Sequence, residues 1–306
     1  MAKPKLISLY SGAGGLDYGF EAAGFQTGAC VEFDHDCCET LRANRGRWGV
    51  IERSIFDVPT AEILETASAR AGEVDLLIGG PPCQPFSKAG YWASGDSARL
   101  EDPRANTLSA YLRVLEETRP RAFLLENVEG LAYSGKDEGL RHLLDGIGRI
   151  NKRTKSNYQP VVKVLNAANF GVPQLRERVF VIASREGESF QFPAATHGEA
   201  EEGTLFKHIG LQPFRTAWDA LADVKPGPSE DLAVRGKWAD LLPSIPEGNN
   251  YLWHTDRGVA RAKEEGLRPG RALFGWRRRY WTFLLKLAKS KPSWTIQAQP
   301  GPAVGP

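Results

Sequence analysis

The sequence predicts an α/β fold with a doubly wound, mostly parallel sheet, followed by a smaller irregular domain. Short apolar runs alternate with segments of helical periodicity from residue 5 to about residue 184. Such alternation is typical of parallel sheets covered by helices. Beyond about residue 185 the alternation stops, and Gly, Pro and Trp become frequent. We therefore expect a larger domain at residues 1–187 and a second domain at residues 188–306.

The individual elements follow from local patterns. The apolar run at residues 6–10 predicts the first strand, and apolar positions at helical spacing after the glycine-rich turn predict the first helix. Further strands are predicted at residues 27–34, 74–80, 121–128, 159–173 and 178–184, and further helices at 35–45, 106–120 and 140–150. In such folds ligands bind at the carboxyl ends of the parallel strands.

The composition excludes several classes of protein. No apolar run approaches the roughly 20 residues that a membrane-spanning helix needs. The first 12 residues lack the pattern of a secretory signal, so we expect a cytoplasmic protein. The cysteines at positions 30, 37, 38 and 83 form no zinc-like spacing with the five histidines. We expect free thiols and no structural metal.

The glycine-rich turn is the first candidate site. Gly12, Gly14 and Gly15 follow the first strand, where a bare backbone can approach a ligand closely. Glu32 ends the second predicted strand, where a carboxylate can accept hydrogen bonds from both hydroxyls of a ribose. The pattern predicts a cofactor that contains a nucleoside. A solvated strand-end glutamate remains the alternative.

The second candidate is Cys83 in the stretch "GGPPCQPFS". This loop follows an apolar strand, and Pro81 and Pro82 restrict the backbone before the thiol. The polar Gln84 and Ser87 place the loop at the ligand-binding edge. A nucleophile requires a setting of this kind. A small buried cysteine is the alternative.

Two further polar features lie near predicted strand ends. Glu126 ends the apolar strand in "FLLENVEGL", where burial would raise the pKa of its carboxyl group and suit it to proton donation, and Asn127 can brace the turn. Gln174, Arg176 and Arg178 alternate toward the last strand and thus share a face. Burying arginine side chains there costs folding free energy unless they contact a carboxylate, a phosphate or a base. A helix-capping or ion-paired glutamate and surface charge on an edge strand are the alternatives.

The charge distribution points to a polyanionic partner. Residues 266–306 hold eight basic and no acidic residues, so of the net charge of +2 the first 265 residues contribute −6. The segment "GWRRRYW" interleaves aromatic rings with Arg277, Arg278 and Arg279, a pattern suited to phosphates and exposed bases. A solvated basic segment with its tryptophans in the core is the alternative.

The motifs "SLYSGAGGLDYGFEAAGF", "GGPPCQPFS", "LLENVEGL" and "QLRERVFVIAS", in this order, resemble the DNA (cytosine-5)-methyltransferase family over roughly residues 5–185. The resemblance implies the fold of S-adenosylmethionine-dependent methyltransferases. It also implies S-adenosyl-L-methionine as methyl donor, base flipping, and double-stranded DNA as substrate, with the protein located at the nucleoid. Segments after residue 240 resemble the family's target-recognition region.

The resemblance assigns roles to individual residues. Cys83 is implied as the nucleophile, Glu126 as the acid at the ring nitrogen, and Arg176 and Arg178 as residues that organise the pocket. The cofactor-binding residues implied are Tyr10, Gly12, Ala13, Gly14, Gly15, Glu32, Phe33 and Pro82. The DNA-binding residues expected are Gln84, Ser87, Arg277, Arg278 and Arg279.

Two departures from the family pattern qualify this assignment. Ser54 stands where the family usually has an acid for the adenine amine, and Asp57 lies nearby but out of register. The family's usual C-terminal segments do not follow the recognition region in this sequence. We therefore expect weak activity without a second polypeptide that supplies them. An RNA cytosine-5 methyltransferase and a non-catalytic DNA-binding chain are the alternatives.

Overall fold

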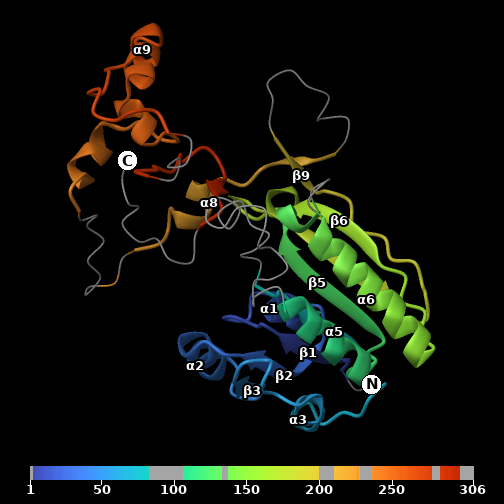
Figure 1. Ribbon diagram of the computed structural model, residues 1–306. Coiled ribbons are helices and arrows are strands. Elements are labelled where there is room, and N and C mark those ends of the chain that lie inside the picture. The colour runs from blue at the N-terminus through green and yellow to red at the C-terminus, as the bar shows by residue number, and fades with distance from the viewer. Residues whose placement is uncertain are drawn as a thin grey trace. The chain divides into compact units, whose positions relative to one another are not determined.

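The computed structural model (Figure 1) describes the chain in two compact units. The first unit comprises Met1–Leu165 and Glu177–Pro193, and the second comprises Asn166–Arg176 and Ala194–Pro306. The residues described within them are 3–82, 106–132, 137–199, 210–225, 227, 236–277 and 283–296.

The first unit is built on a seven-stranded sheet in the order β3-β2-β1-β4-β5-β8-β6. Its strands are β1 (Lys5–Leu9), β2 (Gln26–Glu32), β3 (Gly49–Glu52), β4 (Leu76–Gly79), β5 (Ala122–Val128), β6 (Val161–Asn166) and β8 (Glu177–Ser184). The pairs of β1 with β2, β2 with β3, β1 with β4 and β4 with β5 are parallel, whereas β8 is antiparallel to β5. The predicted doubly wound, mostly parallel sheet is confirmed.

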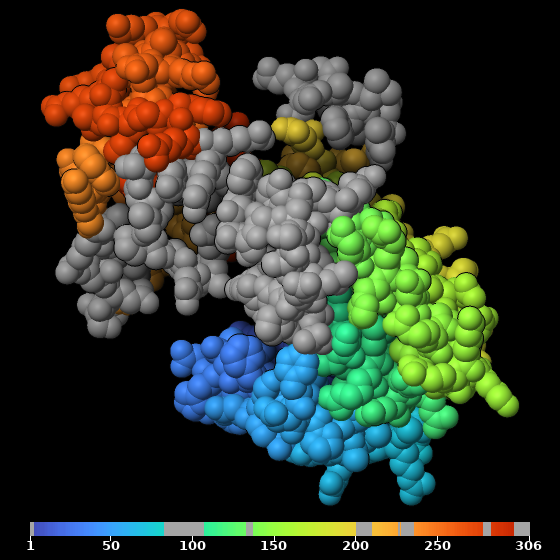
Figure 2. Space-filling model, in the orientation of Figure 1, coloured from blue at the N-terminus to red at the C-terminus, as the bar shows by residue number. Residues whose placement is uncertain are grey.

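Helices cover both faces of this sheet. They are α1 (Gly15–Ala22), α2 (His35–Asn44), α3 (Thr60–Thr66), α5 (Asn106–Thr118) and α6 (Glu138–Thr154), with a 3-10 turn at Glu129–Ala132. The main core joins alternate strand residues such as Ile7 and Leu77 to α3, α5 and α6. Leu6 and Ile78 point to the other face and pack with Leu16 and Phe20 of α1. Helices α5 and α6 pack against each other, and Figure 2 shows their green residues side by side on the surface.

The period-two alternation of each strand explains this layering, because successive side chains enter opposite cores. The predicted helices at 35–45, 106–120 and 140–150 are confirmed. Helix α3, which begins after Pro59 and buries Ile63, is not among the helices predicted from the sequence. Short helices of this kind owe their stability to tertiary packing and carry little local signal.

The second unit has little regular structure among its described residues. Its elements are a 3-10 turn at Ala167–Phe170, β7 (Gln174–Leu175), β9 (His197–Gly198), β10 (Gln212–Pro213), α8 (Ala217–Leu221), 3-10 turns at Ala239–Ser244 and Tyr251–His254, α9 (Asp256–Glu264) and β11 (Ser293–Trp294). Edge-to-face packing of Tyr251, Phe274 and Phe283 forms an aromatic core, and Trp238 packs against Phe274. Within the described residues, no helix is both long enough and apolar enough to cross a bilayer.

Candidate active site

The turn that follows β1 is held in an unusual backbone conformation. Tyr10, Gly12 and Gly14 all have positive φ angles, of 56°, 52° and 89°. The amides of Tyr10 and Ser11 both donate to the carbonyl of Val31, at 2.9 and 3.4 Å. A methyl group added at Gly12 would meet no atom within 4 Å, so space lies open beside the bare backbone. The turn can therefore accept a ligand at close range.

Glu32, the last residue of β2, lies directly against this turn. Its Oε2 accepts the amide proton of Gly12 at 2.8 Å, and its Oε1 accepts those of Phe33 and Asp34 at 2.8 and 2.9 Å. The residue is only 8% exposed, whereas the ring of the adjacent Phe33 is 69% exposed. A fixed carboxylate beside a bare aromatic ring fits a ribose and its base.

The polar groups after β3 differ from what the family pattern suggests. Ser54 accepts the amide proton of Phe56 at 3.4 Å and shapes the turn, and Phe56 itself is exposed. The carboxylate that ends β3 is Glu52, which is bound by Arg42 at 2.5 Å and by His35 at 2.8 Å. The exposed ring of Phe56 is a feature that the sequence analysis missed.

A second polar group forms where β5 and β8 pair. The Nε of Arg178 lies 3.0 Å from Oε1 of Glu126, and both side chains are largely buried. The antiparallel register places Val128 opposite Arg178 and Glu126 opposite Phe180. Arg178 therefore meets a carboxylate, as the cost of placing an arginine on an apolar strand predicts.

The segment that leads to Cys83 packs against this ion pair. A Cβ atom added at Gly80 would stand 3.2 Å from Oε2 of Glu126. Asn127 donates from Nδ2 to the carbonyl of Pro81 at 3.2 Å and accepts the amide proton of Val128 through Oδ1. The expected bracing role of Asn127 is thus met by two specific contacts. The fold places the segment Gly79–Pro82 beside Glu126, although the two are more than 40 residues apart in the sequence.

The remaining predicted site residues are distributed between the units or are not described. Cys83, Gln84, Ser87, Arg278 and Arg279 lie outside the described residues. The thiols at Cys30, Cys37 and Cys38 are free.

Arg176 and Arg277 belong to the second unit. The amide of Arg176 donates to Oδ1 of Asn166 at 3.1 Å, and its carbonyl accepts from Ala167 at 2.9 Å. The hydroxyl of Tyr251 binds both the amide and the carbonyl of Arg277, at 2.9 and 2.5 Å. Because Tyr251 is buried, the backbone of the exposed Arg277 is held in place.

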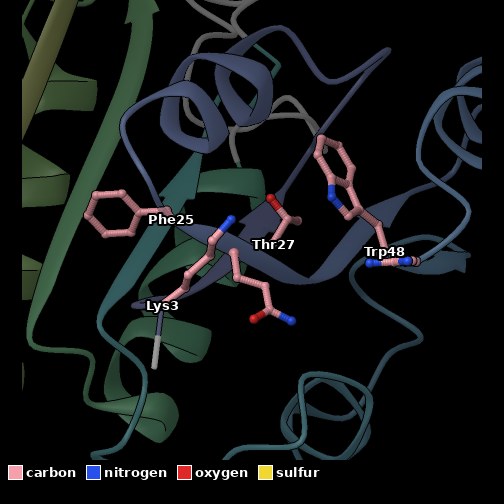
Figure 3. Close-up of a pocket in the computed structure, with 6 residues that line it drawn as sticks. Lys3, Phe25, Thr27 and Trp48 are labelled. Carbon is pink, nitrogen blue, oxygen red and sulfur yellow. The ribbon is translucent and has the colours of Figure 1, made fainter. Parts of the chain in front are cut away.

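A cavity of about 290 Å³ lies at the other end of β2 (Figure 3). It is lined by Lys3, Phe25, Gln26, Thr27, Arg47 and Trp48. Gln26 and Thr27 begin β2, whereas Glu32 ends it. The cavity is therefore separate from the site at the carboxyl edge of the sheet.

Comparison with known proteins identifies the family. The family described as C-5 cytosine-specific DNA methylase matches residues 4–249. The chain belongs to this family. It is a DNA cytosine-5 methyltransferase by membership, and the ordered motifs that suggested the resemblance lie within the matched region.

Two curated relatives of this methyltransferase cover most of its length. It is 41% identical to the type II methyltransferase M.SacI of Streptomyces achromogenes over 314 aligned residues, spanning 98% of this chain and 76% of that protein. It is 43% identical to the type II methyltransferase M.AquIA of Picosynechococcus sp. over 236 residues, spanning 76% of this chain and 93% of that protein.

The fold of the methyltransferase is also found among solved structures. A putative DNA modification methyltransferase encoded within an Escherichia coli prophage superposes with a TM-score of 0.54 at 21% identity. The match covers 85% of this chain and 69% of that chain. This likeness agrees with the α/β fold of the first unit.

Proposed function

We propose that this chain transfers a methyl group from S-adenosyl-L-methionine to carbon 5 of cytosine in duplex DNA, as part of a restriction-modification system. The observation that carries the proposal is the contact of the segment before Cys83 with Glu126, while Arg178 binds the same carboxylate. A nucleophile and an acid on opposite sides of one ring need such closeness. The type II names of both relatives support the biological setting.

The turn after β1 and the end of β2 supply the residues that would hold the cofactor. Glu32 presents a fixed carboxylate for the ribose, Phe33 presents an open ring face for the base, and Gly12 leaves room for the methionine end. Together these residues offer the carboxylate and the aromatic ring that bind the ribose and the base of a nucleoside. When bound, S-adenosylmethionine supplies the electrophilic methyl group that carbon 5 attacks.

The protein's task is to make carbon 5 nucleophilic. The thiolate of Cys83 adds to carbon 6 of cytosine, and the electron pair displaced from the ring double bond becomes available at carbon 5. Glu126 stabilises the adduct by hydrogen bonding or proton donation at nitrogen 3. After methylation, loss of the carbon 5 proton restores the double bond and expels the thiolate.

Arg178 has a defined role in this reaction. Its guanidinium Nε lies 3.0 Å from Oε1 of Glu126, the carboxyl group proposed to act at nitrogen 3. The same guanidinium fixes the carboxylate in one orientation. The target base must leave the duplex to reach this site, at a cost of a few kcal/mol that phosphate contacts offset.

Trapping with 5-fluorocytosine tests the mechanism. Fluorine replaces the proton whose loss releases the enzyme, so a covalent complex with duplex DNA is expected in the presence of S-adenosylmethionine. Cys83→Ala should abolish the complex, whereas Cys37→Ser should leave it unchanged because Cys37 lies on α2. A complex that forms only with 5-fluorocytosine RNA would redirect the proposal to RNA, and no complex with either would contradict it.

We also propose that a second polypeptide covers part of the second unit. Several apolar side chains near α8 and β11 are exposed: Trp218, Leu221, Val224, Trp294 and Ile296. The amide of Ala217 donates to the carbonyl of Lys291 at 2.8 Å, so α8 lies beside the segment that enters β11. An apolar patch of this kind favours a protein partner. Weak tritiated methyl transfer by the chain alone is expected, and robust turnover would refute the need for a partner.

A further inference from the structure

A buried carboxylate lies directly beneath the turn that would receive the cofactor. Asp17, in the first turn of α1, has no exposed surface. Its Oδ2 accepts a hydrogen bond from the hydroxyl of Ser8 at 3.0 Å, and its Oδ1 lies 3.7 Å from the thiol of Cys30. The carboxylate is therefore enclosed by α1, β1 and β2, with one neutral partner from each strand.

A charge in this position is costly to the fold. Burial raises the pKa of Asp17 from its usual 3.8 to about 6, even though the hydrogen bond from Ser8 opposes the shift. Within the described part of the chain, the groups acting on this carboxyl are Ser8, Cys30 and its own backbone amide, all of them neutral. With a pKa of about 6, the carboxyl group is expected to ionise as the pH rises to neutrality. An asparagine would fill the same space and could still accept the hydrogen bond from Ser8 without the cost of a buried charge.

The carboxylate is coupled to the turn by a short chain of hydroxyl groups. Ser11 donates from Oγ to Oγ of Ser8 at 2.9 Å, and Ser8 donates in turn to Asp17. Ser11 immediately precedes Gly12, and its carbonyl accepts the amide proton of Gly14 at 2.9 Å. The negative end of this chain of hydrogen bonds thus lies under the backbone on which the methionine end would rest.

We propose that Asp17, through Ser8 and Ser11, provides an internal counter-charge that makes the turn favour a cationic methyl donor over the neutral product. The inference rests on the proposed function, because it takes the donor to be S-adenosylmethionine. The donor carries a positive sulfonium centre, and the product S-adenosylhomocysteine is a neutral thioether at that atom. A charge in the protein can distinguish the two, because the contacts to the adenosine and amino-acid parts are common to both ligands.

The expected difference in affinity between the cationic donor and the neutral product is large enough to measure. Loss of one elementary charge that acts through a protein interior is expected to change an affinity on the order of tenfold. An enzyme whose product retains every other contact of the donor is prone to product inhibition. Discrimination of this size would aid product release and would explain why a costly carboxylate is retained.

Calorimetric binding of three probes to the full chain tests the proposal. S-adenosylmethionine and sinefungin carry a positive charge near the transferred group, whereas S-adenosylhomocysteine does not. Asp17→Asn is expected to weaken binding of both cationic probes about tenfold at pH 7.5 and to leave the neutral probe within about twofold. Asp17→Ser provides a second neutral variant, and Ser11→Ala keeps the charge while breaking the chain of hydroxyl groups.

The outcomes separate this inference from the proposed function. Equal loss for all three probes in Asp17→Asn, with native circular dichroism, would mean a purely structural role and overturn the inference. Unchanged binding of all three would overturn it as well. Glu32→Gln should weaken all three probes, since the ribose is common to them. If none of the probes bound the wild-type chain, the cofactor proposal would fail first and the inference with it.

Discussion

Glu126 and Arg178 form an ion pair across two antiparallel strands, with 3.0 Å between Oε1 and Nε. The two residues are 52 positions apart, and only the reversed direction of β8 brings them together. The pair fixes the carboxylate beside Gly80 and hence beside the segment that leads to Cys83. The acid of the proposed reaction thereby lies beside Gly80 and Pro81, which precede the proposed nucleophile in the sequence.

Replacing Glu126 by Gln is expected to lower methyl transfer by about 10²- to 10⁴-fold, because a positioned proton donor contributes on that scale. The isosteric amide keeps a hydrogen bond but cannot deliver a proton. Single-turnover methylation of duplex DNA measures the effect. Glu177→Gln, an exposed neighbour on β8, is the matched control and should be near wild type. Equal rates for the two variants would remove Glu126 from the mechanism.

Asn127→Ala is expected to slow adduct formation by roughly tenfold while DNA binding stays unchanged. The side chain is buried and holds the carbonyl of Pro81, so its loss frees the segment before Cys83. Loss of a buried hydrogen bond also costs about 1 to 2 kcal/mol of folding free energy. The rate of 5-fluorocytosine trapping and a urea denaturation curve report the two effects separately. A stability loss with an unaltered trapping rate would confine Asn127 to the fold.

Local patterns single out Glu32 and Glu126 because each follows an apolar run. Glu32 ends β2, whereas β5 continues for two residues beyond Glu126. The cost of burying an arginine predicted that Arg178 needs a partner, but not that Glu126 is that partner. The antiparallel pairing of β8 depends on contacts far apart in the chain, which no local window contains.

The burial of Asp17 could not be predicted from local sequence for a related reason. On a helical pattern it falls next to Leu16, and a charged residue in a first turn ordinarily faces water and favours the helix dipole. Its burial follows from Ser8 and Cys30 on two different strands. The exposure of Phe56 depends likewise on the turn after β3, which Ser54 shapes.

Gly79→Ala is expected to destabilise the first unit by about 1 to 3 kcal/mol, since overpacking a tight core costs that much. A Cβ there would stand 2.8 Å from the ring of Tyr111 and 3.2 Å from the carbonyl oxygen of Leu9. Gly19→Ala on α1 is the matched control, because a Cβ at Gly19 meets nothing within 4 Å. Better helix propensity should make that variant more stable by up to about 1 kcal/mol. Chemical denaturation of both variants would reveal opposite signs.

Asp17→Asn is expected to stabilise the chain without ligand at pH 7.5 and above. The pKa of Asp17 is raised on folding from 3.8 to about 6, so the folded state binds the proton more tightly than the unfolded state. The stability from this group is present below about pH 4 and is lost as the pH rises through about 6. The whole effect corresponds to at most about 3 kcal/mol.

Urea denaturation at pH 4.5, 6 and 7.5 measures this difference. The gain of Asp17→Asn over wild type should grow with pH, whereas Asp145→Asn on the exposed side of α6 should follow wild type throughout. A gain independent of pH would mean that the ionised carboxylate is not the cause.

Arg277→Ala is expected to weaken binding of duplex DNA by a similar factor for every sequence tested. Tyr251 holds the backbone of Arg277 through both its amide and its carbonyl, so the substitution removes the guanidinium without moving the chain. The neighbouring Trp276 is exposed and lies under Arg257, whose guanidinium carbon is 5.0 Å from the ring centre. Positive charge thus gathers around this segment, as phosphate contact requires.

The salt dependence of binding distinguishes a phosphate contact from general loss of charge. Removal of one such contact should reduce the slope of log K against log salt by about one. Arg261→Ala is the matched control, because Arg261 is paired with Glu265 at 2.7 Å on α9 of the same unit. Both variants lose one positive charge, but only Arg277→Ala should change the slope. If the two variants changed it equally, the effect would come from net charge, and Arg277 would have no specific contact with DNA.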